Sequence, residues 1–291
     1  MQELYEFRVY EEFASLVFRD DEGKRLGTSI RKVVLDRDDP RFERVRALQI
    51  EFRARGDFFF MGWGIKRKYS TVEIEAAPLF QVIPTRYFEP EGEECGTLYD
   101  DTQACRFCGT GAPRLGPLIL KTKRIPSTAD IASSIASEIV VSERFVAALK
   151  AARASGFEDE PVFNPGRILA ASAQWRTLRF SNETVRIVPP TVVGDGPFST
   201  GLDPCECGDL VGLNLISELT VDASIRGVED IAVTRQFVGV RRGVLRPWRP
   251  MLVSPEVRQS LIEHRTRGWR FEVVHVRESG TSRPGGEATM P

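Results

Sequence analysis

Two stretches of this chain repeat each other at a fixed spacing. A CRFCG motif at residues 105–109 returns as CECG at residues 205–208, so that Cys205 stands 100 residues after Cys105. The tripeptide Asp-Ile-Ala at residues 130–132 likewise returns at residues 230–232. The order and the distance between the two motifs are therefore unchanged in the second copy.

The later part of the repeat is displaced further. Val-Ser at residues 141–142 and the Gly156 that ends the next apolar segment correspond to Val-Ser at residues 253–254 and to Gly268, 112 residues later. Twelve residues are thus inserted within residues 235–250. A random chain seldom keeps two such registers, so we interpret the pattern as an internal duplication.

Each copy predicts the same order of elements: a cysteine knuckle, strands, one helix and a final strand. Ser142 and Ser254 are favourable helix N-caps, and Gly156 and Gly268 are typical helix stops. We therefore expect an α+β fold in which two pseudo-symmetric repeats share one zinc-ribbon-like site.

The rest of the chain adds an N-terminal segment and a tail. Alternating apolar residues near the start predict β-structure, residues 40–56 suit either a helix or an amphipathic strand, and the aromatic residues 58–63 should fill a core. Ser70 and Glu73 match a capping box. The expected divisions are a β-rich segment at 1–68, the first repeat at 69–165, the second repeat at 166–277 and a disordered tail at 278–291.

Composition limits the class of protein. The formal net charge is -1, with 42% hydrophobic and 28% charged residues, which predicts a soluble globular protein without general affinity for nucleic acid or anionic membrane. No apolar run approaches the roughly 18 residues that cross a bilayer, and no signal peptide is recognisable. We expect a cytoplasmic protein.

Five cysteines are the candidate metal ligands. Cys105 and Cys108 have the two-residue spacing that lets one tight turn direct both thiolates at an ion, and Cys205 and Cys207 form a shorter second pair. Cys95 competes with Cys207 for the last position. Structural zinc is the favoured interpretation; the alternatives are buried free thiols and a redox pair.

Catalysis has little support in the sequence. The only histidines are His264 and His275, which suit ordinary surface or core positions, and no nucleophile, phosphate-binding or dinucleotide-binding motif occurs. We expect no enzymatic activity.

Two oppositely charged loops could bind a partner. An acidic loop at residues 86–101 precedes the first knuckle, and an arginine-rich loop at residues 235–250 lies in the insertion. They could instead pair with each other across the repeats. The candidate binding residues are Arg241, Arg242, Arg246, Arg249, Glu91, Glu93 and Glu94.

The chain resembles an uncharacterised bacterial family of zinc-knuckle proteins. The similar pieces are GWGIKRKY at residues 62–69, the first knuckle with Glu94-Cys95 before it, GLNLISE at 212–218 and GVRRGVLRP at 239–247. A shorter part, EIVVSERF at 138–145, resembles the double-CXXCG proteins of myxobacteria, which are regarded as immunity proteins that neutralise a toxin. The shorter second knuckle departs from that pattern.

These observations favour a non-catalytic binding protein, and the resemblance implies an immunity protein that occludes a toxin by presenting its charged loops. The alternative is a zinc-ribbon protein that binds nucleic acid through the arginine-rich loop.

Overall fold

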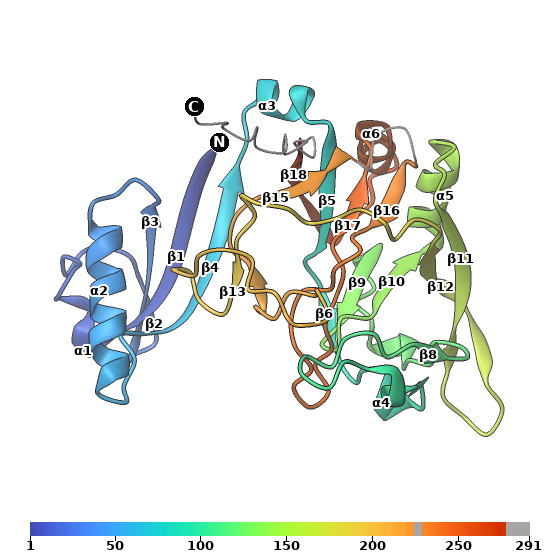
Figure 1. Ribbon diagram of the computed structural model, residues 1–291, viewed down its shortest axis with the longest axis horizontal. Helices are drawn as coiled ribbons and strands as arrows, with labels where there is room; N and C mark the ends of the chain where they lie inside the picture. The colour runs from blue at the N-terminus through green and yellow to red at the C-terminus, as the bar shows by residue number, and fades with distance from the viewer. Residues whose placement is uncertain (224–228, 278–291) are drawn as a thin grey trace, which may run out of the picture.

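The computed structural model describes residues 1–223 and 229–277. Figure 1 shows a four-stranded sheet from the N-terminal part of the chain, followed by two five-stranded sheets. The tail predicted at residues 278–291 lies outside the described residues. None of the helices in the described ranges combines the length and the hydropathy needed to span a membrane.

The N-terminal sheet has the strand order β2-β3-β1-β4 and packs against helix α2 (Figure 1). Its elements are β1 (Gln2–Tyr10), α1 (Glu11–Ala14), β2 (Lys24–Leu26), β3 (Ile30–Asp36), α2 (Arg41–Ala54) and β4 (Phe60–Lys68). Phe42, Val45, Leu48 and Phe52 recur at helical spacing and form the buried face of α2. A helix, rather than a strand, therefore covers this core.

The aromatic segment before and within β4 is only partly buried. Phe59 and Phe60 are 0% and 5% exposed, whereas Phe58 and Met61 are 47% and 58% exposed. The prediction that the whole segment fills a core was thus wrong for Phe58 and Met61. Neighbouring strand residues such as Phe60 and Met61 point to opposite sides of a sheet, so they cannot enter the same core.

Two five-stranded sheets make up the remainder. Sheet I has the order β11-β12-β10-β9-β6, and sheet II has the order β15-β18-β5-β17-β16. Their strands are β5 (Leu79–Pro84), β6 (Tyr87–Phe88), β9 (Ile131–Ser134), β10 (Ile139–Ser142), β11 (Phe157–Asn164), β12 (Ala170–Phe180), β15 (Leu219–Asp222), β16 (Ile231–Val233), β17 (Met251–Val253) and β18 (Trp269–Arg277). The fold is mixed α+β, as expected.

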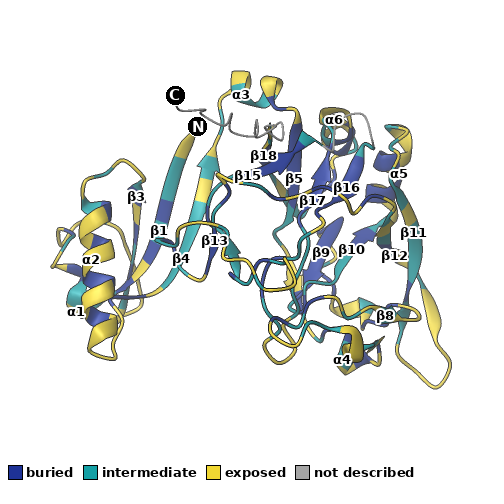
Figure 2. Cartoon of the chain, viewed as in Figure 1, coloured by how far each residue is buried: buried dark blue, intermediate teal, exposed yellow. Residues whose placement is uncertain are grey.

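Helices and short elements connect these strands. The longer helices are α5 (Glu143–Ala151) and α6 (Pro255–Glu263), and the short elements are α3 (Thr71–Ala76), α4 (Gly92–Cys95), β7 (Leu98–Tyr99), η1 (Asp101–Gln103), β8 (Arg114–Leu115), η2 (Thr122–Arg124), β13 (Val193–Gly194) and β14 (Asn214–Leu215). The dark blue strands in Figure 2 show that the central strands of both sheets are buried. One apolar cluster joins sheets I and II with α5 and α6.

The predicted helix caps are confirmed. The hydroxyl of Ser142 accepts a hydrogen bond from the backbone of Phe145 at the start of α5, and Ser254 caps α6 in the same way. Ser70 and Glu73 form both hydrogen bonds of the capping box before α3. These short-range signals fixed the helix starts correctly because each cap depends only on residues within one turn.

The strand registers of sheets I and II correspond. Val141 pairs with Ile131 in sheet I, and Val253 pairs with Ile231 in sheet II. Val253 lies 112 residues after Val141, and Ile231 lies 100 residues after Ile131. The sequence motifs show the same two offsets. The recurring motifs therefore occupy corresponding places in the two sheets.

Each sheet also takes one inner strand from the other part of the chain. Phe157 of β11 pairs with Phe180 of β12, whereas Trp269 of β18 pairs with Pro84 of β5. Strand β12 thus holds the place in sheet I that β5 holds in sheet II. Because β5 precedes the first knuckle and β12 follows β11, sheet II contains a strand from residues 69–165 and sheet I contains one from residues 166–277.

Reciprocal hydrogen bonds join the two halves. The backbone N–H of Arg267 donates to Oδ2 of Asp130 over 2.9 Å, and the N–H of Ser155 donates to Oδ2 of Asp230 over 2.9 Å. Arg267 and Ser155 are themselves 112 residues apart. The aspartate of each Asp-Ile-Ala motif therefore holds the turn before the final strand of the opposite copy.

Gly156 and Gly268 do not end the helices, as was predicted, because α5 ends at Ala151 and α6 at Glu263; they lie directly before β11 and β18. Gly156 and Gly268 have φ angles of +97° and +94°, which favour glycine. A Cβ atom would lie 2.2 Å from the carbonyl oxygen of Ile231 at Gly156, and 2.5 Å from that of Ile131 at Gly268. Both positions thus require glycine for backbone conformation and for close packing between the halves.

A buried arginine connects the N-terminal sheet to sheet II. The side chain of Arg67 on β4 is 2% exposed and forms ion pairs with Glu3 on β1, at 2.8 Å, and with Glu272 on β18, at 2.6 Å. Its burial in a low-dielectric environment makes both carboxylates necessary to offset the desolvation of the guanidinium. This ion-pair network fixes β4 beside sheet II.

Candidate metal centre

The first knuckle is a tight loop closed by its own backbone. The N–H of Cys105 donates to the carbonyl of Thr110 over 2.8 Å, and the N–H of Gly109 donates back to the carbonyl of Cys105 over 2.8 Å. Gly109 has a φ of +71°, which a residue with a side chain rarely adopts. This loop brings Cys108 back beside Cys105.

The second knuckle closes in the same manner with one residue fewer. The N–H of Cys205 donates to the carbonyl of Asp209 over 2.7 Å, and the N–H of Gly208 donates to the carbonyl of Cys205 over 2.9 Å. The returning bond spans three residues here and four residues in the first knuckle. The shorter turn explains how a Cys-x-Cys-Gly sequence still directs both thiols to one side.

The four thiols of the two knuckles meet. The Sγ atoms of Cys105 and Cys205 are 3.8 Å apart, those of Cys108 and Cys207 are 3.5 Å apart, and all four lie within 4.8 Å of one another. Four thiolates around a tetrahedral zinc, with Zn–S bonds of about 2.3 Å, would be about 3.8 Å apart. The separations far exceed the roughly 2.05 Å of a disulfide bond, so the cluster suits a metal ion.

Backbone donors also tune the thiols. The N–H groups of Cys108 and Phe107 point at the sulfur of Cys105 and lower the pKa of its thiol to about 6, because they favour the thiolate. Burial raises the pKa of the Cys108 thiol instead. A bound cation would favour the thiolate form of every member of the cluster.

Two polar side chains that the sequence analysis did not identify support the cluster. The hydroxyl of Thr110 lies 3.1 Å from the sulfur of Cys108 and donates to Oδ2 of Asp209 over 2.6 Å. Oδ2 of Asp209 lies 3.5 Å from the sulfur of Cys207, and its Oδ1 accepts from the N–H of Phe237 over 2.9 Å. Their shared position, directly after each knuckle glycine, was the signal that could have identified them.

Cys95 does not belong to the cluster of thiols found among the described residues. It lies at the end of α4, where it is buried, and burial raises the pKa of its thiol. The structure therefore completes the group of four with Cys207, and not with Cys95. Neither histidine joins it: His264 is bonded to its own helix through Ser260, and His275 contacts Glu218.

The acidic and arginine-rich loops contact each other beside the metal centre. Arg246 lies 2.8 Å from Glu93, with its guanidinium 3.7 Å from the ring centroid of Tyr99, and its side chain is 8% exposed. Arg241 pairs with Glu93 at 3.2 Å and with Asp101, and its backbone N–H donates to the carbonyl of Cys108. Pairing between the two loops, one of the two sequence-based interpretations, is what the structure has.

The remaining candidate binding residues are dispersed. Glu91 is buried and caps α4, because its carboxylate accepts hydrogen bonds from the backbone N–H groups of Glu93 and Glu94. The side chain of Glu94 itself is exposed. Arg242 pairs with Asp195 at 3.4 Å on the surface. Arg249 pairs with Glu183 at 2.6 Å and lies over a phenylalanine ring. These residues do not form one continuous charged surface.

The donor set defines what the centre can do. Four thiolates around one ion leave no coordination position for a substrate or a water molecule, and this is the arrangement of structural rather than catalytic zinc. The sequence matches no family model and no curated protein.

Proposed function

We propose that Cys105, Cys108, Cys205 and Cys207 hold one structural zinc ion, and that the chain is a non-catalytic binding protein. The near-tetrahedral spacing of the four thiols is the observation that carries the zinc proposal. Thiolate ligands favour zinc over the hard cations magnesium and calcium. The ion would neutralise charge on the thiolates and fix the two knuckles to each other.

The zinc would also join two copies of one ancestral unit. The matching strand registers, the exchanged strands β5 and β12, and the reciprocal hydrogen bonds of Asp130 and Asp230 support an internal duplication. In this arrangement each repeat contributes one knuckle. The pseudo-symmetric core is then a rigid base on which loops and the N-terminal sheet are held in place.

We propose a bacterial toxin as the partner, because a short part of the chain, residues 138–145, resembles immunity proteins and because the centre lacks an open metal position. The mechanism would be occlusion of the toxin by a rigid cytoplasmic scaffold. Arg241 and Arg246 pair internally, so the binding surface would not depend on these two arginines. The same pairing gives the nucleic-acid alternative little support.

Metal analysis tests the zinc proposal. The protein purified without chelator should contain one zinc per chain by mass spectrometry, and Cys105→Ser and Cys205→Ser should each lose it and unfold at a lower temperature. Cys95→Ser is the matched control and should retain the metal. Absence of zinc from the wild type, or its retention in both knuckle variants, contradicts the proposal.

Co-expression tests the binding role. The product of a gene adjacent to this one should arrest growth when expressed alone, and co-expression of this chain should restore growth by forming a complex. Growth arrest that persists in the presence of the folded, zinc-loaded chain contradicts the immunity role without affecting the zinc proposal.

A further inference from the structure

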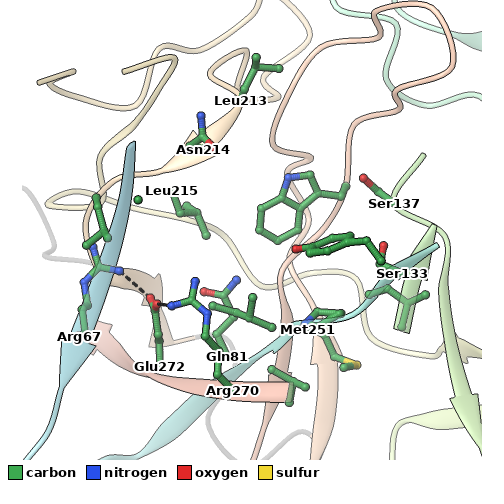
Figure 3. Close-up of a pocket in the computed structure, with 18 of the residues that line it drawn as sticks. Arg67, Gln81, Ser133, Ser137, Leu213, Asn214, Leu215, Met251, Arg270 and Glu272 are labelled. Atoms are coloured by element: carbon green, nitrogen blue, oxygen red, sulfur yellow. Dashed lines mark hydrogen bonds and ion pairs between the residues drawn. The ribbon is translucent and has the colours of Figure 1, made fainter. Parts of the chain in front are cut away.

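A cavity of about 620 Å³ lies between the N-terminal sheet and sheet II (Figure 3). Its walls come from β4, from β5 and β17 of sheet II, and from the segment at residues 213–215. The ion pair of Arg67 with Glu272 borders it. Its volume falls in the range of about 300–1,000 Å³ that is usual for ligand sites.

One wall is the open edge of a β-strand. Strand β4 is the last in the order β2-β3-β1-β4, and within the described residues it pairs only with β1. Five consecutive residues of β4, 61–65, line the cavity. The outward N–H and C=O groups of such an edge can pair with an added strand.

Gly62 and Gly64 leave one face of β4 without side chains at these positions. A Cβ atom at Gly64 would meet nothing within 4 Å, and one at Gly62 would meet only the side chain of Arg8, at 3.5 Å or more. This face of β4 therefore has open space for the side chains of a strand added at the edge. Larger side chains at these positions would fill that space.

A buried polar group faces the same cavity without a partner. Gln81 on β5 is 1% exposed, and its Nε2 has no hydrogen-bond partner among the described residues. Figure 3 shows its amide next to the guanidinium of Arg270, inside the cavity. A buried donor left unpaired is unfavourable, so an acceptor supplied by a ligand would stabilise the complex.

Guanidinium groups add hydrogen-bond donors to the cavity. Arg249 and Arg270 line it, and each also pairs with one carboxylate of the protein, Arg249 with Glu183 at 2.6 Å and Arg270 with Glu272 at 2.7 Å. The buried Nε of Arg249 also lacks a partner in the described part of the chain. Guanidinium and amide N–H groups together form a site for a carboxylate.

Apolar side chains provide the remaining surface. Met61 and Tyr87 are 58% and 62% exposed at the cavity, and Trp63, Trp248 and Leu215 also line it. Pockets of this kind on either side of an open strand edge receive alternate side chains of an extended peptide.

We propose that this cavity, the β4 groove, binds an extended segment of a partner protein that adds to β4 as a fifth strand and places a carboxylate against Gln81, Arg249 and Arg270. The inference rests on the proposed role as a binding protein and assigns the partner-binding surface. The recognised chemistry is an extended strand with alternating apolar side chains and one Asp, Glu or C-terminal carboxylate.

A random 12-residue peptide library displayed on phage provides the probe. Selection on the immobilised, full-length, zinc-loaded chain should enrich sequences that alternate apolar residues and contain a carboxylate. A fluorescent synthetic peptide with the selected sequence should bind Gln81→Leu and Arg270→Gln at least about tenfold more weakly than wild type. Arg277→Gln, on the same strand as Arg270 but outside the groove, should bind like wild type.

N-methylated peptides test strand addition itself. Methyl groups on alternate backbone nitrogens should abolish binding in one register and leave it unchanged in the other, because only every second N–H of an added strand faces β4. Lack of enrichment, equal binding by the groove variants, or tolerance of both methylated registers overturns the inference. If a complex with the toxin still forms in Gln81→Leu and Arg270→Gln, the groove is not the binding surface, but the proposed function stands. If the wild type forms no complex or contains no zinc, the proposed function is wrong.

Discussion

Thr110 and Asp209 are bonded to each other across the metal centre. The hydroxyl of Thr110 donates to Oδ2 of Asp209 over 2.6 Å, and each residue directly follows the glycine of its knuckle. Each also contacts a thiol of its own knuckle, Thr110 at Cys108 and Asp209 at Cys207. This pair therefore links the two knuckles independently of the ion and orients one thiol in each.

Thr110→Val should weaken metal binding. Valine keeps the shape of the buried side chain but removes the donor to Asp209 and the contact with Cys108, and loss of such a supporting contact commonly reduces metal affinity about 10–100-fold. Competition with a chelator measures the affinity. Thr28→Val, an exposed threonine in the N-terminal part, is the control and should leave the affinity unchanged. Equal affinities for both variants would show that Thr110 does not support the centre.

Gly268→Ala should destabilise the contact between the two halves. Alanine at a φ of +94° costs about 1–2 kcal/mol, and its Cβ would lie 2.5 Å from the carbonyl oxygen of Ile131. Backbone displacement adds about 1–3 kcal/mol. Gly27→Ala, at a φ of +72° with nothing within 4 Å, bears only the conformational cost. Urea unfolding of both variants measures the difference in free energy of unfolding. Equal destabilisation would show that the contact between residue 268 and the carbonyl of Ile131 does not contribute.

Local and paired features differ in how far the sequence could predict them. The caps at Ser142 and Ser254 depend on neighbouring residues, and the knuckle glycines on local backbone conformation, so these were accessible from the sequence. The exchange of β5 and β12 was not, because strand pairing joins residues far apart in the chain, and neither strand carries a signal for its partner.

The metal cluster shows the same limit. Repetition identified Cys105 and Cys205 as equivalent, but the choice between Cys95 and Cys207 depended on how a shorter turn closes. The charged loops were correctly recognised as complementary, yet the sequence left open whether they bind each other or a partner. The loops bind each other because packing of the two halves places them side by side.

Arg246→Met should lower the free energy of unfolding by about 2 kcal/mol. The substitution removes the contact with the Tyr99 ring and leaves Glu93 with fewer positive neighbours in a partly buried site. Arg242→Met is the matched control from the same loop, because its side chain is 56% exposed and its pair with Asp195 contributes less than about 1 kcal/mol. If denaturant unfolding gave equal values for both variants, the internal role assigned to Arg246 would be wrong.

His275→Gln should remove a pH-dependent part of the stability. His275 Nε2 lies 2.9 Å from Oε2 of Glu218, and the hydrogen bond with this carboxylate raises the pKa of His275 above its usual value of 6.5. The folded state therefore holds the proton more tightly than the unfolded state does. The resulting stabilisation is complete below about pH 6.5 and is lost as the pH rises through the higher pKa of the folded state.

The difference in unfolding free energy between wild type and His275→Gln should accordingly be larger at pH 6 than at pH 9. Its size should stay below about 1 kcal/mol, because the His275 side chain is 53% exposed and water screens the pair. Subtracting the variant from wild type cancels the titration of the thiols, which both proteins share. In a Glu218→Gln background the same substitution should lose most of this pH dependence. A difference that persisted without Glu218, or that grew toward pH 9, would assign the effect to another group.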